Sequence, residues 1–128
     1  MNTQRKYRRT KEDRLIEIMF SPNWSAASTA ADDLVSMILA EDESQNRIME
    51  IWSRSNFHFK NSVAFYATDQ ELLTLAEILV KGDEREDDDI LNGIANNKHC
   101  SASTLQSIRE KAKRLGFILE IFSERGSY

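Results

Sequence analysis

Apolar residues recur along the chain at spacings of three and four residues, and short polar breaks separate one run from the next. This spacing places apolar side chains on one face of a helix. The pattern therefore predicts five to seven helices joined by short connections. The expected helices cover about 10–20, 26–40, 44–54, 68–81 and 88–96, and a last one starts at Ser101 or Ser103 and ends near 115.

Residues that stop or start helices stand at the borders of these runs. Pro22 ends the first run because the residue before a proline is pushed out of the helical region. Residues 68–71 (TDQE) form a capping box, in which side chains bond the free N–H groups of the first helical turn. Gly82 and Gly116 stand where glycine closes a helix. These signals support the helical interpretation of the pattern.

Two segments fit more than one structure. Residues 57–66 place aromatic side chains around Lys60 and Asn61, and they fit either a short hairpin or a loop followed by a short helix. Residues 117–122 fit either a terminal strand or a buried tail. The predicted fold class is therefore all-α, with minor strands allowed near 57–66 and 117–122. The alternative is an α+β domain in which these two segments pair, with or without a winged helix.

Residues 15–29 and 90–104 echo each other: each has an apolar helical face, a polar break, and a Ser/Thr-containing start of a second apolar run. Such a unit cannot bury its apolar face alone, so it stacks on a neighbour. The two stretches resemble units of HEAT-like and variant leucine-rich helical repeats, and 51–56 is a loose third copy. The resemblance implies irregular stacked helical hairpins that bind a partner, and it transfers no catalytic residue.

Residues 95–105 also resemble a helix-turn-helix, since Ala95, Cys100 and Thr104 have the spacing of its core, although His99 stands where that motif prefers glycine. The resemblance implies a recognition helix over 102–115 that enters the major groove of DNA. Asp87, Asp88 and Asp89, at the start of the preceding helix, would repel phosphates and count against it. The nucleic-acid-binding residues under this alternative are Arg5, Lys6, Arg8 and Arg9 of the basic arm and Ser103, Gln106, Arg109 and Lys113 of the helix.

Composition limits the class of protein. The chain has 128 residues, 41% hydrophobic and 30% charged, which is typical of one globular domain. Its one cysteine, Cys100, cannot form an internal disulfide, and no apolar run approaches the ~18 residues of a membrane span. Residues 1–11 lack the apolar core of a secretory signal. We therefore expect a cytoplasmic protein, with a flexible arm over 1–11, one helical domain over 12–123, and a frayed tail over 124–128.

The net charge of −4 hides an asymmetry between the arm and the rest of the chain. Residues 1–11 carry five basic side chains and no acidic one, so the remainder is strongly acidic. A basic arm can bind phosphates, whereas an acidic body argues against a broad nucleic-acid-binding face. The acidic run over 83–89 lacks the ligand alternation of a calcium loop, and it fits a solvated connection or a patch that meets a basic partner.

No pattern of catalytic or ligand-binding residues stands out. His99 and Cys100 are adjacent, but no second pair follows at zinc spacing. The four glycines are scattered, so no phosphate-binding loop is present. We therefore expect no enzymatic activity, no cofactor and no bound metal.

The function expected from these observations is that of a small protein-binding module, an accessory or inhibitory factor of a bacterial or phage type. It would dock on another protein through an acidic surface that includes Asp87, Asp88 and Asp89. Trp24, in a short turn, fits either a core position or an exposed binding anchor. The alternative function is DNA binding by 88–115 together with the basic arm. The oligomeric state stays open.

Overall fold

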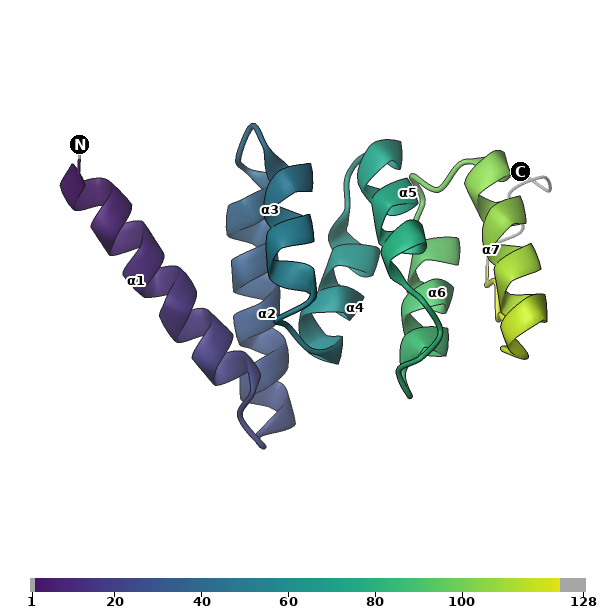
Figure 1. Ribbon diagram of the computed structural model, residues 1–128, viewed down its shortest axis with the longest axis horizontal. Coiled ribbons are helices and arrows are strands. Elements are labelled where there is room, and N and C mark those ends of the chain that lie inside the picture. The colour runs from purple at the N-terminus through teal and green to yellow at the C-terminus, as the bar shows by residue number, and fades with distance from the viewer. Residues whose placement is uncertain (1, 123–128) are drawn as a thin grey trace. The chain divides into compact units, whose positions relative to one another are not determined.

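The structure, a computed structural model, describes the backbone of residues 2–122 and the side chains of residues 11–122. Within that range seven helices follow one another and no strand forms (Figure 1). The helices are α1 (Asn2–Met19), α2 (Trp24–Leu39), α3 (Ser44–Trp52), α4 (Phe57–Tyr66), α5 (Gln70–Leu79), α6 (Asp87–Ala95) and α7 (Ala102–Leu115). The predicted all-α class and the predicted helix number are confirmed.

The first two helices begin earlier than predicted. The backbone is helical from Asn2, whereas the sequence pattern placed the start of the first helix at Thr10. Residues 2–9 contain no proline or glycine and are rich in good helix formers, so nothing stops the helix there. The second helix starts at Trp24 because the Asn23 side chain accepts a hydrogen bond from the N–H of Ala26 and caps it.

Residues 57–66 form α4, so the hairpin prediction is wrong for this segment. Asn56 starts the helix, since its side-chain oxygen accepts a hydrogen bond from the N–H of His58 at 3.1 Å. Phe59 and Val63, four residues apart, are both completely buried. Helical spacing therefore buries two large side chains on the same face.

Residues 117–122 form no strand, and the predicted strand at this position is also wrong. Gly116 closes α7 with a φ of +77°, and the N–H of Phe117 returns to the carbonyl of Ala112 at 2.8 Å. The following segment is extended but has no neighbouring strand, because the elements beside it are helices. It is not a buried tail either, since Ile118 and Phe122 are 80% and 82% exposed.

The chain divides into two compact units, residues 1–62 and residues 63–128, with the boundary inside α4. Whether the two units form the single domain predicted over 12–123 depends on how they combine, so that domain stays a prediction. In unit 1, α2 and α3 lie alongside each other and share a core with the end of α1 (Figure 1). The completely buried large side chains of this core are Met19, Leu34, Ile38, Ile48, Ile51 and Phe59.

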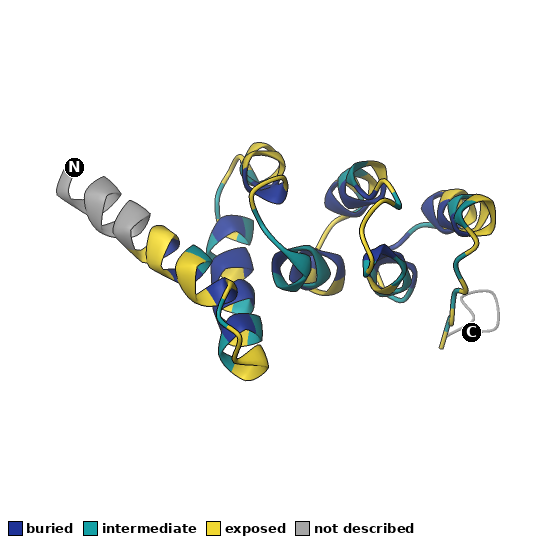
Figure 2. Cartoon of the chain, turned by 60° about the horizontal axis from the view of Figure 1, so that its bottom comes forward, coloured by how far each residue is buried: buried dark blue, intermediate teal, exposed yellow. Residues whose placement is uncertain are grey.

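In unit 2, α5, α6 and α7 run side by side with roughly aligned axes, and Figure 2 shows them almost end-on. Each of the three helices turns a buried face toward the others and an exposed face outward. The completely or almost completely buried large side chains are Leu72, Leu73, Ile90, Leu91, Ile94 and Ile108. The polar breaks of the two echoing stretches, near 21–23 and 96–101, are both turns between helices, as the pattern indicated.

None of the helices in the described range is long and apolar enough to cross a membrane.

Candidate protein-binding surfaces

Three aromatic side chains of unit 1, Trp24, Phe57 and His58, form what we call the aromatic cluster. The ring of Trp24 meets that of His58 edge to face, with centroids 4.4 Å apart. The ring of Phe57 lies 5.8 Å from both. Despite these contacts Trp24 is 63% exposed. Of the two possibilities left open for Trp24, a core position is wrong and an exposed position is confirmed.

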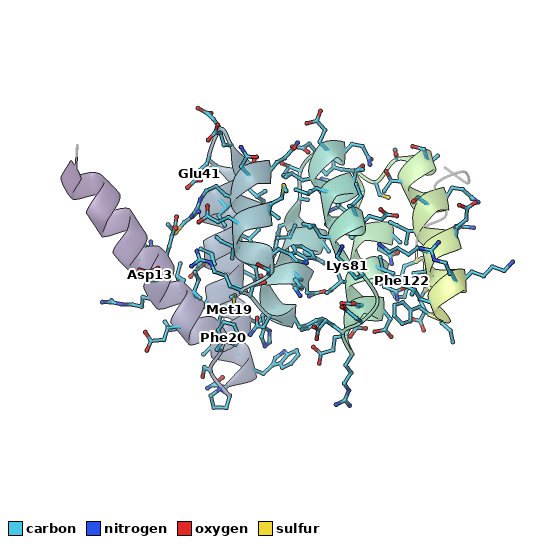
Figure 3. The ribbon with its side chains drawn as sticks, in the orientation of Figure 1. Asp13, Met19, Phe20, Glu41, Lys81 and Phe122 are labelled. Atoms are coloured by element: carbon cyan, nitrogen blue, oxygen red, sulfur yellow. The ribbon has the colours of Figure 1, made fainter. Side chains whose placement is uncertain are left out.

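Asn56 fixes the start of α4, which carries two members of the aromatic cluster. Its side-chain nitrogen donates a hydrogen bond to the carbonyl of Met19 at 2.8 Å, and its oxygen accepts one from the N–H of His58. The start of α4 is thereby bonded to the end of α1, close to the turn from which α2 begins. Phe20, which is 54% exposed, follows Met19 at this end of α1 (Figure 3). Phe20 and Trp24 therefore flank the turn over 21–23 as two exposed aromatic residues.

A shallow groove of about 410 Å³ lies between α1 and α2 in the same unit. Its floor is formed mainly by small and apolar residues, and Asp33 lies among the lining residues. Ile18 lines the groove and is 37% exposed. Unit 1 thus presents apolar surface both in this groove and at the aromatic cluster.

The acidic residues at the start of α6 do not act as one patch. Asp87 is buried, and its carboxylate accepts hydrogen bonds from the N–H groups of Gly82 at 2.8 Å and Glu84 at 3.1 Å. Gly82 has a φ of +84°, so the Asp87 carboxylate stabilises a loop that turns sharply. Asp88 is half-buried and Asp89 is exposed. Only these two remain available to a partner.

Partial desolvation at the start of α6 raises the pKa of the Asp89 carboxyl group above its ordinary value, although the side chain is largely exposed, and the neighbouring charge of Asp88 raises that pKa further. Both effects disfavour the ionised form of Asp89. A basic group of a partner placed beside the two carboxylates would relieve this repulsion.

The residues of the helix-turn-helix alternative lie on α7. Ser103, Gln106, Arg109 and Lys113 are all exposed, opposite the buried residues of this helix. The helix starts with Ser101, whose hydroxyl accepts a hydrogen bond from the N–H of Thr104 at 3.1 Å. However, α6 and α7 have roughly aligned axes (Figure 1), whereas the two helices of a helix-turn-helix cross at about 90–120°. The side chains of Arg5, Lys6, Arg8 and Arg9 lie outside the described residues.

Sequence reasoning missed a second group of residues: Asn92 of α6 and Asn96, which caps the C-terminal end of this helix. Both side chains hydrogen-bond the main chain of residues 117–122, and a groove of about 650 Å³ opens beside them. The signal that could have pointed to this arrangement is two asparagines at helical spacing together with a later apolar segment, residues 117–122, that is too short for a helix. The signal is weak because asparagine is also common in turns.

The environment of Cys100 is that of a buried small side chain. Its thiol lies 3.6 Å from the carbonyl of Ser101. Among residues 11–122 no group of three or more His, Cys, Asp or Glu side chains is placed to hold a metal ion.

Comparison with known proteins gives no match: no protein-family model, no curated protein and no solved structure is significantly similar to this chain.

Proposed function

We propose that the protein is a small, non-enzymatic protein-binding module that docks on another protein through the aromatic cluster of unit 1. The observation that carries this proposal is the position of Trp24, which remains largely exposed at the first residue of α2. A tryptophan buries a large area when a partner covers it, and tryptophan is enriched among the residues that dominate binding free energies.

The surroundings of Trp24 support a binding role. His58 and Phe57 support one side of the indole, so its orientation is already restricted before a partner arrives. A side chain that is held in place loses less conformational entropy on binding. Phe20 and the groove between α1 and α2 add further apolar surface in the same unit.

The charge of the chain supports a basic partner. The net charge is −4, and all 21 acidic residues lie after residue 11. Asp88 and Asp89 of unit 2 offer a second, weaker contact of the kind that steers association. An accessory or inhibitory factor that binds a basic surface would use the aromatic cluster for affinity and these two carboxylates for steering.

The test uses the full chain as bait against an extract of its host, with Trp24→Ala and Ile78→Ala baits alongside. Ile78 is 60% exposed and belongs to unit 2, so it is a matched exposed apolar control. Each captured protein is then purified, and its affinity for the three chains is measured by calorimetry. We expect Trp24→Ala to weaken binding about 30-fold, which corresponds to about 2 kcal/mol, and Ile78→Ala to leave it unchanged. Equal affinities for the three chains would refute the proposal.

The DNA-binding alternative is tested separately by a salt series with duplex DNA. If α7 reads DNA, Arg109→Ala with Lys113→Ala weakens binding and reduces the dependence on salt concentration. Under the proposal above, any DNA binding is non-specific and these two changes leave it within a factor of two. A loss of DNA binding with the double variant would favour the alternative over the aromatic cluster.

A further inference from the structure

Asn92 and Asn96, which we call the Asn pair, hold the main chain of residues 117–122, which we call the extended segment. The Asn92 side chain donates a hydrogen bond to the carbonyl of Ile118 at 3.1 Å and accepts one from the N–H of Glu120 at 2.6 Å. The Asn96 side chain donates to the carbonyl of Glu120 at 2.8 Å and accepts from the N–H of Phe122 at 2.8 Å. Each amide therefore bonds the segment as a neighbouring strand would.

The spacing of the two asparagines matches that of an extended chain. Four residues of an α-helix rise about 6.0 Å, and two residues of a strand rise about 6.6 Å. The main-chain groups of residues 118, 120 and 122 consequently face the Asn pair in register. The helix also orients both amides, since Asn92 Nδ2 donates to the carbonyl of Asp88 at 2.8 Å and Asn96 Nδ2 donates to the carbonyl of Asn92 at 2.9 Å.

The Asn pair recognises the main chain of the segment and makes little use of its side chains. Exposure alternates along the segment: residues 117, 119 and 121 are half-buried, and residues 118, 120 and 122 are exposed. Ile118 and Phe122 are 80% and 82% exposed, although both are large and apolar. A site that bonds carbonyl and N–H groups accepts any extended segment that presents them at the same spacing.

The four hydrogen bonds lie at the surface of unit 2, where water can replace them. Elements held by exposed hydrogen bonds open at a low free-energy cost compared with the core. A groove of about 650 Å³ adjoins the site, and Asn92, Asn96 and Phe122 are among its lining residues. Phe65, which is 67% exposed, and Tyr66 also line this groove. An incoming segment would thus find main-chain partners and apolar surface together.

We propose that the Asn pair is a main-chain-reading site for an extended peptide segment of another protein, and that residues 118–122 of the same chain occupy this site until such a segment displaces them. The segment that fits is rich in large apolar side chains, as residues 117–122 themselves are, with Glu120 as the one charged position. One of these side chains enters the groove beside Phe65. The site lies in unit 2 and is independent of the aromatic cluster.

The probe is a fluorescein-labelled peptide with the sequence of residues 116–126 (GFILEIFSERG), and its binding to the full chain is followed by anisotropy. Three chains are compared: the natural chain, Glu120→Pro and Glu120→Gln. Proline removes the N–H that Asn92 accepts, so it weakens the hold on the internal segment, while glutamine keeps that N–H. We expect Glu120→Pro to bind the peptide at least about tenfold more tightly than the other two.

Two controls separate main-chain recognition from adhesion of apolar side chains. Adding Asn92→Ala with Asn96→Ala to the Glu120→Pro chain should abolish binding, and alanine is a good helix former, so α6 is retained. A peptide N-methylated at the amides that match Glu120 and Phe122 should bind at least about tenfold more weakly than the unmodified peptide, since it cannot donate to the Asn pair. Equal binding of the two peptides would overturn the proposal.

A second measurement uses the natural chain and does not depend on the proline variant. Hydrogen exchange at the amides of Glu120 and Phe122 should speed up at least about tenfold when unlabelled peptide is added in excess. No acceleration would overturn the proposal. A dimer of the natural chain at high concentration that the Asn92→Ala and Asn96→Ala changes abolish would also overturn it, because the site would then belong to a second copy.

Discussion

The side-chain nitrogen of Asn97 lies 3.1 Å from the carbonyl oxygen of Ala67 and 3.0 Å from that of Ala64. One buried amide after α6 therefore bonds the carbonyl groups that α4 leaves free at its end. The oxygen of the same amide accepts a hydrogen bond from the N–H of His99 at 2.8 Å and shapes the turn that leads to α7. Asn97 is thus a structural residue, whereas the neighbouring Asn96 binds the extended segment.

Replacing Asn97 by alanine should destabilise the protein by about 2–3 kcal/mol. The change leaves buried carbonyl groups without a donor, and such groups lose their hydration without compensation. Urea denaturation followed by circular dichroism measures the free energy of unfolding. Lys98→Ala, at the exposed next position, is the control and should change this free energy by less than about 0.5 kcal/mol. Similar effects of the two changes would show that the Asn97 bonds contribute little.

Arg47 is predicted to be the main polar support of unit 1. Its guanidinium group lies 2.5 Å from Glu12, 2.9 Å from Glu50 and 3.4 Å from Glu41. Removing it leaves the buried Glu12 without its partner, so Arg47→Ala should cost about 1–3 kcal/mol of unfolding free energy.

The control for Arg47 is Arg54, whose contact with Glu50 is 3.7 Å long and largely exposed. Arg54→Ala should cost less than about 0.5 kcal/mol, as exposed ion pairs do. Thermal unfolding of both variants at low and high salt compares the two pairs. Equal shifts in Tm for both would contradict a special role for Arg47.

Asp87 and Asp88 should behave differently when neutralised. Asp87→Ala removes the acceptor of the Gly82 and Glu84 N–H groups, so we expect a loss of about 1–3 kcal/mol in unfolding free energy. Asp88→Ala should be nearly neutral for stability because Asp88 is only half-buried. Chemical denaturation of the two variants measures both free energies of unfolding, and equal losses would contradict this prediction. A binding test of the acidic surface therefore has to use Asp88 and Asp89 and keep Asp87.

The raised pKa of Asp89 predicts a specific pH dependence. Since the folded state binds this proton more tightly than the unfolded state, ionisation of Asp89 destabilises the fold at neutral pH. Asp89→Asn should therefore raise Tm at pH 7. The gain should shrink as the pH falls through the raised pKa and vanish below the ordinary aspartate range, where both states are protonated. Tm measured against pH for the variant and the natural chain tests this, and a gain that grows in acid would contradict it.

Most of the helices follow from local features of the sequence. Residues 26–40 and 102–115 have apolar positions at helical spacing, and both contain helices in the structure. Ser101 and Gly116 mark the two ends of α7 through cap geometry that depends on neighbouring residues alone. The start of α1 and the helix α4 were harder to predict, since neither has a proline or glycine at its border.

The candidate sites needed the tertiary structure. Residue type does not separate Asp87 from Asp88, and the conformation of the 82–86 loop buries the first and leaves the second half-buried. The contacts of Trp24 with Phe57 and His58 likewise join residues that are far apart in the chain.

The sequence by itself determined the all-α class, most helix positions and the turns between them, because hydrophobic spacing and capping act within a few residues. Only the tertiary structure decided that the Asn pair meets residues 117–122, more than twenty residues away in the chain. An amide side chain can bond a turn, a helix end or an extended main chain with similar energy, so its partner is selected by packing.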